Sequence, residues 1–381
     1  MAIETYSLPH GSLITPAFLP DATLGVVRSV DSTDLAACGV EGVVMNTFHL
    51  MQHPGSTTIQ ALGGLNQMAG WPRPIVTDSG GFQAYSLIHA NPKFGHLSEK
   101  GITFQPEGSS RKYQLTPEKC IQLQMTYGSD IVICLDDCTH VDAPFEEQQE
   151  SVRRTIDWAR RGKREFQRLA EQKHLEPAAI PRLFAVIQGG GYPDLRRQCA
   201  EALLETGFDG YGYGGWPLDS QSHLLVDIIG LTRQLIPSEL PMHALGVGHP
   251  ENVLACYDLG YDLFDSAMPT RDARHGRLYG FTLDASGPIA GLSGKWLEYI
   301  YIQDERYTKD RRPISPYCDC PTCTHYSIGY LHHLFKVNDS AFLRLATLHN
   351  LRFMTQLSQR LRQRRMGQAG SGAVHPDLEP A

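Results

Sequence analysis

Short apolar runs alternate with longer amphipathic segments along the chain. Eight of these runs are five to seven residues long and are bounded by glycine, proline or polar residues, as expected of strands. They span 16–22, 42–48, 74–78, 131–136, 183–188, 208–214, 243–248 and 263–268. Segments with helical periodicity lie between most of them, so the pattern predicts strands and helices in alternation.

Four of the amphipathic segments are predicted as helices. The segment 116–128 begins with Thr116, a residue type that caps helices, continues with Pro117 at the first helical position, and closes on Gly128. The other three are 146–172, 192–207 and 250–260. The first of these three has one polar and one apolar side, and the last two run from a proline near the start to a closing glycine.

This alternation fits two architectures, an open doubly wound sheet and a closed (β/α)8 barrel. The positions of polar residues and glycines favour the barrel. They fall at or just after the carboxyl ends of predicted strands, at Asp78, Asp136, Gln188, Gly214, Gly215, Gly246 and Asp265. In a barrel these ends converge at one mouth, where active sites are built. We therefore expect an α/β protein with a TIM barrel.

Additions interrupt and follow the barrel pattern. Residues 101–116 alternate around a Gly-Ser-Ser turn at 108–110 and predict a β-hairpin insertion. Residues after 280 are irregular and contain three closely spaced cysteines. The expected organisation is a barrel over 1–280, a cysteine-containing subdomain over 281–337, a helix completing the barrel over 338–366, and a disordered tail over 367–381.

Composition narrows the class of protein. The hydrophobic fraction of 41% is enough for a large core, and no apolar stretch approaches the roughly 18 residues of a membrane helix. The first residues lack a basic region followed by an apolar core, so we expect no secretory signal. The nine cysteines are odd in number and mostly scattered, which favours reduced thiols and a cytoplasmic location. A net charge of -7 does not favour nucleic-acid binding overall, although a local basic patch could still bind it.

The three closely spaced cysteines predict a metal site. Cys318, Cys320 and Cys323 have the spacing C-x-C-x2-C, and a closed tetrahedral zinc site needs one more ligand. The nearby candidates for that ligand are His325, His332, His333 and His349. Four protein ligands leave no open position, so we expect structural zinc rather than catalytic zinc. The alternative is a loop with three reduced cysteines.

Three acids at predicted strand ends are candidates for catalysis. Asp78 precedes Ser-Gly-Gly, Asp136 opens Asp-Asp-Cys, and Asp265 follows Leu-Phe. Each alone could be a helix cap or a turn acid. Two carboxylates at one sugar can break a glycosidic bond, one as nucleophile and one handling the leaving group's proton. A third acid, with an amide such as Gln188, could bind the edge of a base. The pattern therefore predicts glycosyl transfer or hydrolysis at the barrel mouth.

Several long segments together resemble the bacterial tRNA-guanine transglycosylases. They are TDSGGFQ, SDIVICLDDCT, FAVIQGGGYPDLR, GFDGYGYGG, LGVGHPENV, LFDSAMPTRDARHG and CDCPTC with YLHHL and LHNLRF. The resemblance extends from about residue 12 to about residue 360. It implies a TIM barrel with a zinc subdomain, and exchange of guanine at the tRNA wobble position for a 7-deazaguanine, on the route to queuosine.

The resemblance also implies roles for individual residues. Asp265 matches the nucleophile that holds a covalent RNA intermediate, and Asp78 matches the acid/base aspartate. The residues matched to base binding are Phe82, Asp136, Cys138, Gln188, Gly214, Gly215, Trp216 and Leu245. The zinc ligands by match are Cys318, Cys320, Cys323 and His349. A homodimer is expected, because family members often form one.

Basic residues near the nucleophile and near the C-terminus are candidate contacts to the anticodon loop. Arg271 and Arg274 lie just past Asp265, and Arg271 matches the RNA-contacting Pro-Thr-Arg of the family. A second group lies between 340 and 366, where no acid occurs. It comprises Arg344, Arg352, Arg360, Arg362, Arg364 and Arg365. A solvated helix face is an equally good explanation of this second group.

The chain departs from the family in the loop after the sixth strand. Bacterial members usually have Val-Gly-Gly-Leu-Ala-Val-Gly-Glu there, and this chain has YGGWPLDS over 213–220. Trp216 replaces the leucine, and Ser220 replaces a carboxylate that suits an ammonium group, although Asp219 is next to it. His249 stands where relatives have a lysine. The incoming base is therefore left open between an aminomethyl precursor, a nitrile, queuine and another 7-deazaguanine.

Other functions remain as alternatives. The same base exchange could act on DNA or on a free nucleoside. The chain could be an inactive partner subunit, but such subunits should have lost the catalytic acids, and Asp78 and Asp265 are both present. An unrelated barrel glycosidase would not need the cysteine cluster or the base-binding set.

Overall fold

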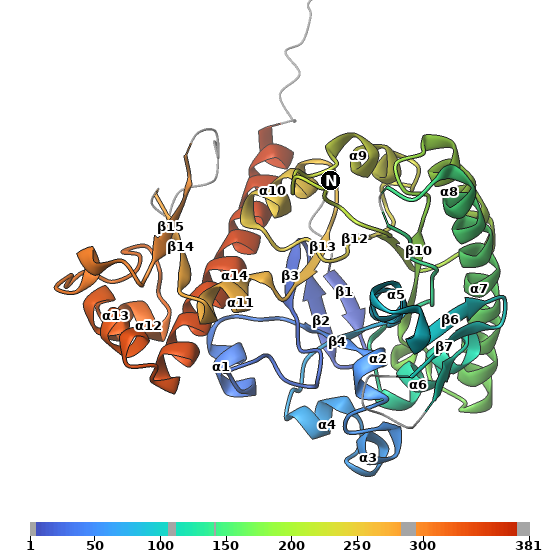
Figure 1. Cartoon of the computed structure of the whole chain (residues 1–381), viewed down its shortest axis with the longest axis horizontal. Coiled ribbons are helices and arrows are strands. Elements are labelled where there is room, and N and C mark those ends of the chain that lie inside the picture. Colours follow the sequence, from blue (N-terminus) through green and yellow to red (C-terminus); the bar gives the residue numbers. More distant parts are fainter. Residues whose placement is uncertain (1–4, 106–111, 141, 283–294, 372–381) are drawn as a thin grey trace, which may run out of the picture.

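The computed structural model describes residues 5–105, 112–140, 142–282 and 295–371, and its centre is a barrel of parallel strands (Figure 1). The strands are β3 (Ala17–Pro20), β4 (Val43–Asn46), β5 (Ile75–Asp78), β9 (Ile131–Ile133), β10 (Arg182–Ile187), β11 (Gly210–Tyr213), β12 (Met242–Ala244) and β13 (Leu263–Ser266). Each one overlaps a strand predicted from the sequence, and β12 shares only 243–244 with the predicted run.

The eight-stranded sheet closes on itself. Its hydrogen-bonded order is β3-β13-β12-β11-β10-β9-β5-β4. From β4 to β13 neighbouring strands follow one another in sequence, and the first barrel strand, β3, pairs with the last, β13. The two end strands, β3 and β4, meet through a parallel bridge between Asp21 and Val44. The Ala22 N–H donates to the Val44 carbonyl at 2.7 Å. The barrel prediction is therefore confirmed, and the open sheet is excluded.

The inside of the barrel is apolar, and one of its ends is closed by a hairpin. Strands β1 (Thr5–Leu8) and β2 (Gly11–Ile14) pair antiparallel, and their Leu8 and Leu13 join the inner cluster formed by barrel residues such as Val76 and Leu263. Asp130, just before β9, accepts from the His10 N–H at 2.7 Å and the Ile75 N–H at 2.8 Å. The hairpin therefore plugs the amino end and leaves the carboxyl end for the site.

Helices cover the outside of the barrel (Figure 1). They are α1 (Ser32–Ala37), α2 (Thr47–Leu50), α3 (Ser56–Ala61), α4 (Leu65–Ala69), α5 (Gly81–Ala90), α6 (Pro117–Tyr127), α7 (Phe145–Gln172), α8 (Pro193–Thr206), α9 (Val226–Gln234), α10 (Pro250–Asp258) and α11 (Met268–Arg274), with short 3-10 turns at Pro92–Phe94 and Pro177–Ala179. In α6 the Thr116 side chain accepts from the Lys119 N–H, and Gly128 ends the helix with a φ of 81°. Among the described residues, no helix is both long and apolar enough to cross a bilayer.

A three-stranded sheet is inserted between β5 and α6. Strands β7 (Gly101–Phe104) and β8 (Tyr113–Leu115) lie in the segment predicted as a hairpin and pair antiparallel, and the predicted turn at 108–110 lies outside the described residues. Strand β6 (Gly95–Ser98) pairs with β7 on its other side. It was not predicted, because Gly-His-Leu-Ser is short and contains a single apolar side chain, Leu97.

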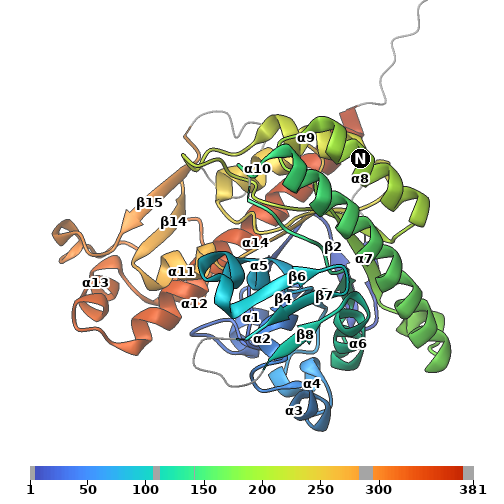
Figure 2. The same cartoon turned by 45° about the vertical axis from the view of Figure 1, so that its right-hand side comes forward.

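The C-terminal part forms a separate group of elements beside the barrel (Figure 2). It contains β14 (Arg277–Phe281), β15 (Leu297–Tyr301), a 3-10 turn at Glu305–Tyr307, α12 (Pro321–His325) and α13 (Ile328–Lys336). The long helix α14 (Ser340–Ser371) packs on α11, α12 and α13. It runs beyond 366 to Ser371, so the first residues of the predicted tail are helical, and 372–381 lie outside the described residues.

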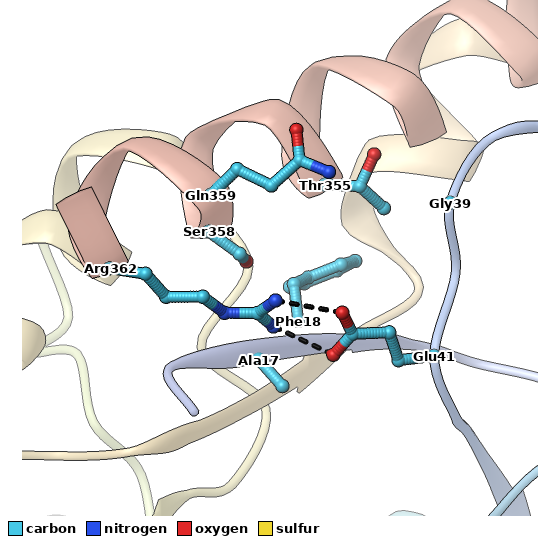
Figure 3. Close-up of a pocket in the computed structure, with 8 residues that line it drawn as sticks. All are labelled: Ala17, Phe18, Gly39, Glu41, Thr355, Ser358, Gln359 and Arg362. Carbon is cyan, nitrogen blue, oxygen red and sulfur yellow. Dashed lines mark hydrogen bonds and ion pairs between the residues drawn. The ribbon is translucent and has the colours of Figure 1, made fainter. Parts of the chain in front are cut away.

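The arginines of α14 hold this helix to the rest of the protein. Arg362 forms two hydrogen bonds with the Glu41 carboxylate, both 2.7 Å long, beside Phe18 of β3 (Figure 3). Four others form ion pairs, Arg344 with Asp34, Arg352 with Asp319, Arg364 with Asp258 and Arg365 with Asp262. Arg360 lies over the Phe281 ring, 3.7 Å from its centroid. These contacts favour a structural role for the group, and its interpretation as phosphate contacts stays a prediction.

Candidate active site at the carboxyl ends of the barrel strands

Asp78 ends β5 and is held by its neighbour on β4. Asn46 is its register partner, and Asn46 Nδ2 donates to Asp78 Oδ2 at 2.9 Å. Gly80 follows with a φ of 86°, and a Cβ there would lie 2.6 Å from the Phe48 side chain, so the chain can turn into α5 only with glycine. Burial raises the pKa of Asp78 to about 7, and the charges of Asp136 and Asp265 add to this effect.

Asp136 lies just after β9 in a buried polar group. Gln188 Nε2 donates to Asp136 Oδ2 at 2.7 Å, and Ser79 Oγ donates to Oδ1 at 3.3 Å. Burial raises the pKa of Asp136 to about 6, although both hydrogen bonds favour the ionised form. Gln188 Oε1 is buried without a hydrogen-bond partner in the described part of the chain. It is an acceptor that a ligand N–H could satisfy.

Gly214 and Cys138 complete this group. A Cβ on Gly214 would lie 2.6 Å from Gln188 Nε2, so glycine is required for the close approach of the Gln188 amide. The Cys138 thiol is buried, and burial together with the charges of Asp136 and Asp137 raises its pKa well above the usual value. Cys138 is therefore a neutral thiol at physiological pH rather than a thiolate nucleophile.

Asp265 stands on β13 with one oxygen held by its surroundings. The Gly246 N–H donates to Asp265 Oδ1 at 3.0 Å, and His243 Nε2 lies 2.9 Å from the same oxygen. Asp265 Oδ2 has no hydrogen bond to the described residues. Asp21, after β3, is a fourth acid at the mouth, and its pKa is raised by burial and by the charge of Asp265.

Aromatic side chains lie around the mouth. Phe82, on the first turn of α5, and Trp216, after β11, are in edge-to-face contact with ring centroids 5.3 Å apart. Trp216 also packs near His140, with ring centroids 5.6 Å apart. Both Phe82 and Trp216 are exposed in part, at 37% and 36%. Leu245 packs against the inner barrel cluster. A planar ligand could stack on these exposed rings.

The loop that begins at 213–220 is held together by hydrogen bonds to its own Asp219. The Asp219 carboxylate accepts backbone N–H groups from Gln221 and His223, each at 2.8 Å, and lies 3.4 Å from the His223 ring. A bridge between Leu218 and Leu224 closes the loop further. The Asp219 carboxylate is thus engaged within the loop.

Basic residues lie on one side of the mouth. Arg271 is exposed on α11, and no ion pair joins it to any described residue. Arg274 Nη1 is buried without a hydrogen-bond partner among these residues. The pKa of Arg274 is lowered first by burial and then by the charge of Arg28. His249 Nε2 lies 2.8 Å from the Tyr299 hydroxyl, and burial lowers the pKa of His249, so it adds no charge at neutral pH.

The fourth residue of the cysteine cluster, His349, belongs to α14. One ligand atom from each of Cys318, Cys320, Cys323 and His349 lies within 4.8 Å of the others, and all four residues are buried. His349 Nδ1 lies 3.2 Å from Cys323 Sγ. The other ring nitrogen, Nε2, donates to the Tyr279 carbonyl at 2.6 Å, which leaves Nδ1 for a metal. This donor set fits a tetrahedral metal ion with no open position.

The other histidines considered from the sequence, including the exposed His333, are not members of the cluster. His332 Nδ1 donates to the Ile302 carbonyl at 2.7 Å, and His325 Nδ1 lies 2.9 Å from the Pro321 carbonyl. All nine cysteines, including those of the cluster, are buried and form no disulfide.

Three residues at the mouth were missed from the sequence. Asn46 and Asp21 follow the same rule as Asp78, a polar residue at the end of a predicted strand, so that signal could have found them. His243 gave no such signal, because it lies at the start of the run 243–248 and reads as a strand-interior residue. Only the pairing of β12 with β13 places it beside Asp265.

Comparison with known proteins gives one consistent result. The sequence matches the family described as queuine tRNA-ribosyltransferase over residues 2–366. A queuine tRNA-ribosyltransferase of Psychrobacter cryohalolentis is 38% identical over 358 residues, which cover 94% of this chain and 88% of that protein. Another, of Thermoanaerobacter sp. (strain X514), is 37% identical over 355 residues, with 93% and 87% covered. A third, of Actinobacillus pleuropneumoniae serotype 3, is 37% identical over 361 residues, with 94% and 87% covered.

Proposed function

Because the chain belongs to the queuine tRNA-ribosyltransferase family, we propose that it exchanges wobble guanine for a 7-deazaguanine through a covalent intermediate on Asp265. As a member of this family, the chain is a pentosyltransferase that acts in tRNA guanine transglycosylation. The observation that carries this proposal is the pair of unlike carboxylates at one mouth. Asp78 has a pKa raised to about 7, whereas Asp265 has one oxygen held by the Gly246 N–H and the other without a hydrogen bond to the described residues. Paired carboxylates in different environments suit a proton-transfer role and a nucleophilic role.

In the first half of the reaction Asp265 attacks the ribose. Its Oδ2 forms a bond to C1′ as the bond from C1′ to guanine N9 breaks, and the electron pair of that bond leaves with the guanine. Asp78, protonated at the start, gives its proton to the departing base. The RNA is then held as an ester on Asp265, and guanine is released neutral.

In the second half the same groups work in reverse. The Asp78 carboxylate takes the N9 proton of the incoming base, the base nitrogen bonds to C1′, and the Asp265 carboxylate leaves. The proton taken by Asp78 replaces the one it gave, so the cycle consumes no acid. A pKa near 7 suits this group for both directions at neutral pH.

The buried polar group beside Asp78 would bind the base. The Asp136 carboxylate accepts ring and exocyclic N–H groups, and the free Gln188 Oε1 can accept another. The Gly214–Gly215 backbone and the Cys138 side chain would line the same site, with Leu245 beneath it. Phe82 and Trp216 would cover the base by stacking. The wobble base lies in an anticodon loop, where it can be unstacked to reach this site.

The incoming base should carry a neutral substituent. In the loop over 213–220, Trp216 replaces a leucine, Ser220 has no charge, and the Asp219 carboxylate is engaged by Gln221 and His223. An ammonium group would therefore find no unengaged carboxylate among the described residues of this loop. We propose that a nitrile or another uncharged 7-substituent is preferred over the aminomethyl form.

The remaining features support this function indirectly. We propose that the ion held by Cys318, Cys320, Cys323 and His349 is zinc, which would fasten α14 to the C-terminal subdomain over 281–337 and take no part in the chemistry. Arg271 and Arg274 are the proposed phosphate contacts. A homodimer and a cytoplasmic location remain predictions.

Guanine exchange with labelled guanine tests the proposal directly. Unmodified tRNA, a DNA stem-loop of the same sequence and free guanosine are compared as acceptors, and a panel of 7-deazaguanines then competes with the label. We expect incorporation into tRNA alone and stronger competition by the nitrile than by the aminomethyl base. Incorporation only into DNA or guanosine would reassign the acceptor, and none into any of them would refute the exchange.

A further inference from the structure

His243 lies fully buried beside the proposed nucleophile. It belongs to β12, which pairs with β13, and its register partners on the two adjacent strands are Leu263 and Gly212. Leu263 points into the barrel, and so does Asp265 two residues later, so His243 and Asp265 share the inner face. The Nε2 atom of His243 lies 2.9 Å from Asp265 Oδ1.

The imidazole lacks other partners. Neither Nδ1 nor Nε2 of His243 makes a regular hydrogen bond to the described residues, although Nε2 lies 2.9 Å from Asp265 Oδ1. Buried polar atoms in native proteins are nearly always paired, and catalytic hydrogen bonds are often poorly aligned until substrate is bound. The Asp265 carboxylate is an acceptor within reach of Nε2, and a rotation of the ring would align the two groups.

We infer that His243 is a positioning residue for Asp265, which rests on the proposed function of Asp265 as the nucleophile. His243 donates its Nε2–H to Oδ1, the oxygen that already accepts from the Gly246 N–H. With Oδ1 fixed by two donors, the carboxylate cannot rotate, and Oδ2 is presented to C1′. The buried, rigid strand pair β12–β13 makes this orientation permanent.

The same contact serves both halves of the exchange. When Oδ2 is esterified, Oδ1 becomes the ester carbonyl and can keep both donors. When the incoming base displaces the ester, negative charge returns to the carboxylate, and a donor at Oδ1 stabilises that charge as it develops. The loss of this donor should therefore slow chemistry and leave RNA binding unchanged.

A matched pair of substitutions isolates the donor. His243→Gln places an amide N–H at about the reach of Nε2, whereas His243→Met has similar length and volume without a donor. Both full-length variants are compared with the wild type in thermal unfolding, in the single-turnover rate of covalent complex formation with an anticodon stem-loop, and in steady-state kcat and KM for tRNA.

We expect H243M to lose about tenfold to a hundredfold in the single-turnover rate and in kcat, the range for a hydrogen bond to a charged group, with KM for tRNA unchanged. H243Q should recover most of that loss at a melting temperature equal to that of H243M. Equal rates for H243Q and H243M, whether high or low, would overturn the inference. A wild-type protein that forms no covalent complex would instead refute the proposed function, so the two failures are distinguishable.

Discussion

Asn46 and Asp78 end two adjacent barrel strands, and the Asn46 amide donates to Asp78 Oδ2 across 2.9 Å. This hydrogen bond favours the carboxylate, whereas burial and the charges of Asp136 and Asp265 favour the neutral acid. Burial and the two neighbouring charges outweigh the hydrogen bond, since the pKa of Asp78 is raised to about 7. The balance gives Asp78 the proton affinity that an acid and base at neutral pH requires.

The first prediction concerns stability and follows from this raised pKa. A carboxyl group whose folded pKa lies above its unfolded value of 3.8 stabilises the fold most at low pH, and that contribution is lost as the pH rises to about 7. Asp78→Asn removes the cost of ionisation. In urea unfolding from pH 4 to 8, the variant should gain stability relative to wild type as the pH rises, on the order of a few kcal/mol. A difference that stays constant with pH would contradict the raised pKa.

The second prediction concerns the pH dependence of guanine release. In single turnover, release needs protonated Asp78, so its rate should fall as the pH rises through about 7. Asn46→Ser removes the amide donor but keeps a residue type that can cap α2. The falling limb should then move to higher pH, because the charged form of Asp78 has lost a hydrogen bond. Rates that do not depend on pH, or an unmoved limb in N46S, would exclude Asp78 as the proton donor.

The third prediction separates RNA-binding from structural arginines. Arg271→Ala should weaken tRNA binding several-fold. The slope of the logarithm of the binding constant against the logarithm of the salt concentration should become shallower by roughly 0.7, the contribution of one phosphate contact. Arg362→Ala is the matched control, because Arg362 is engaged by Glu41. It should lower the melting temperature and leave the affinity for tRNA unchanged. The reverse pattern would place the RNA on α14.

The fourth prediction concerns the metal cluster. Cys323→Ser should abolish binding of one zinc per chain, measured by elemental analysis, and should lower the melting temperature because α14 loses its tie to α12. Cys256→Ser, a buried free cysteine on α10, is the control and should retain the metal. Zinc content that survives C323S would refute the assignment of the ligands.

The sequence predicted the barrel because its strands are short apolar runs and most of them end at a polar residue or a glycine. Asp78, Asp136 and Asp265 could be found in this way, since their positions follow from where the strands end. The partner of each acid could not be found so directly. Whether Asn46 or His243 contacts a given carboxylate depends on the register between strands, which a single sequence does not specify.

The charge pattern of α14 could not be interpreted from the sequence alone. A run of arginines without an acid resembles a nucleic-acid contact when it is considered alone. Their partners Asp34, Glu41, Asp258, Asp262 and Asp319 are scattered over more than half of the chain. Only the folded structure brings these acids to the helix, so local composition could not distinguish an ion-paired face from a binding surface.

The central claim is that Asp265 holds the RNA covalently during exchange. The direct measurement is the intact mass of a denatured mixture of the protein with a cognate anticodon stem-loop, for wild type and for Asp265→Ala. We predict a wild-type adduct with the mass of protein plus RNA minus one guanine, and no adduct in D265A, which still binds the stem-loop. An adduct of this mass in D265A, or guanine exchange by a wild-type protein that never forms one, would contradict the account.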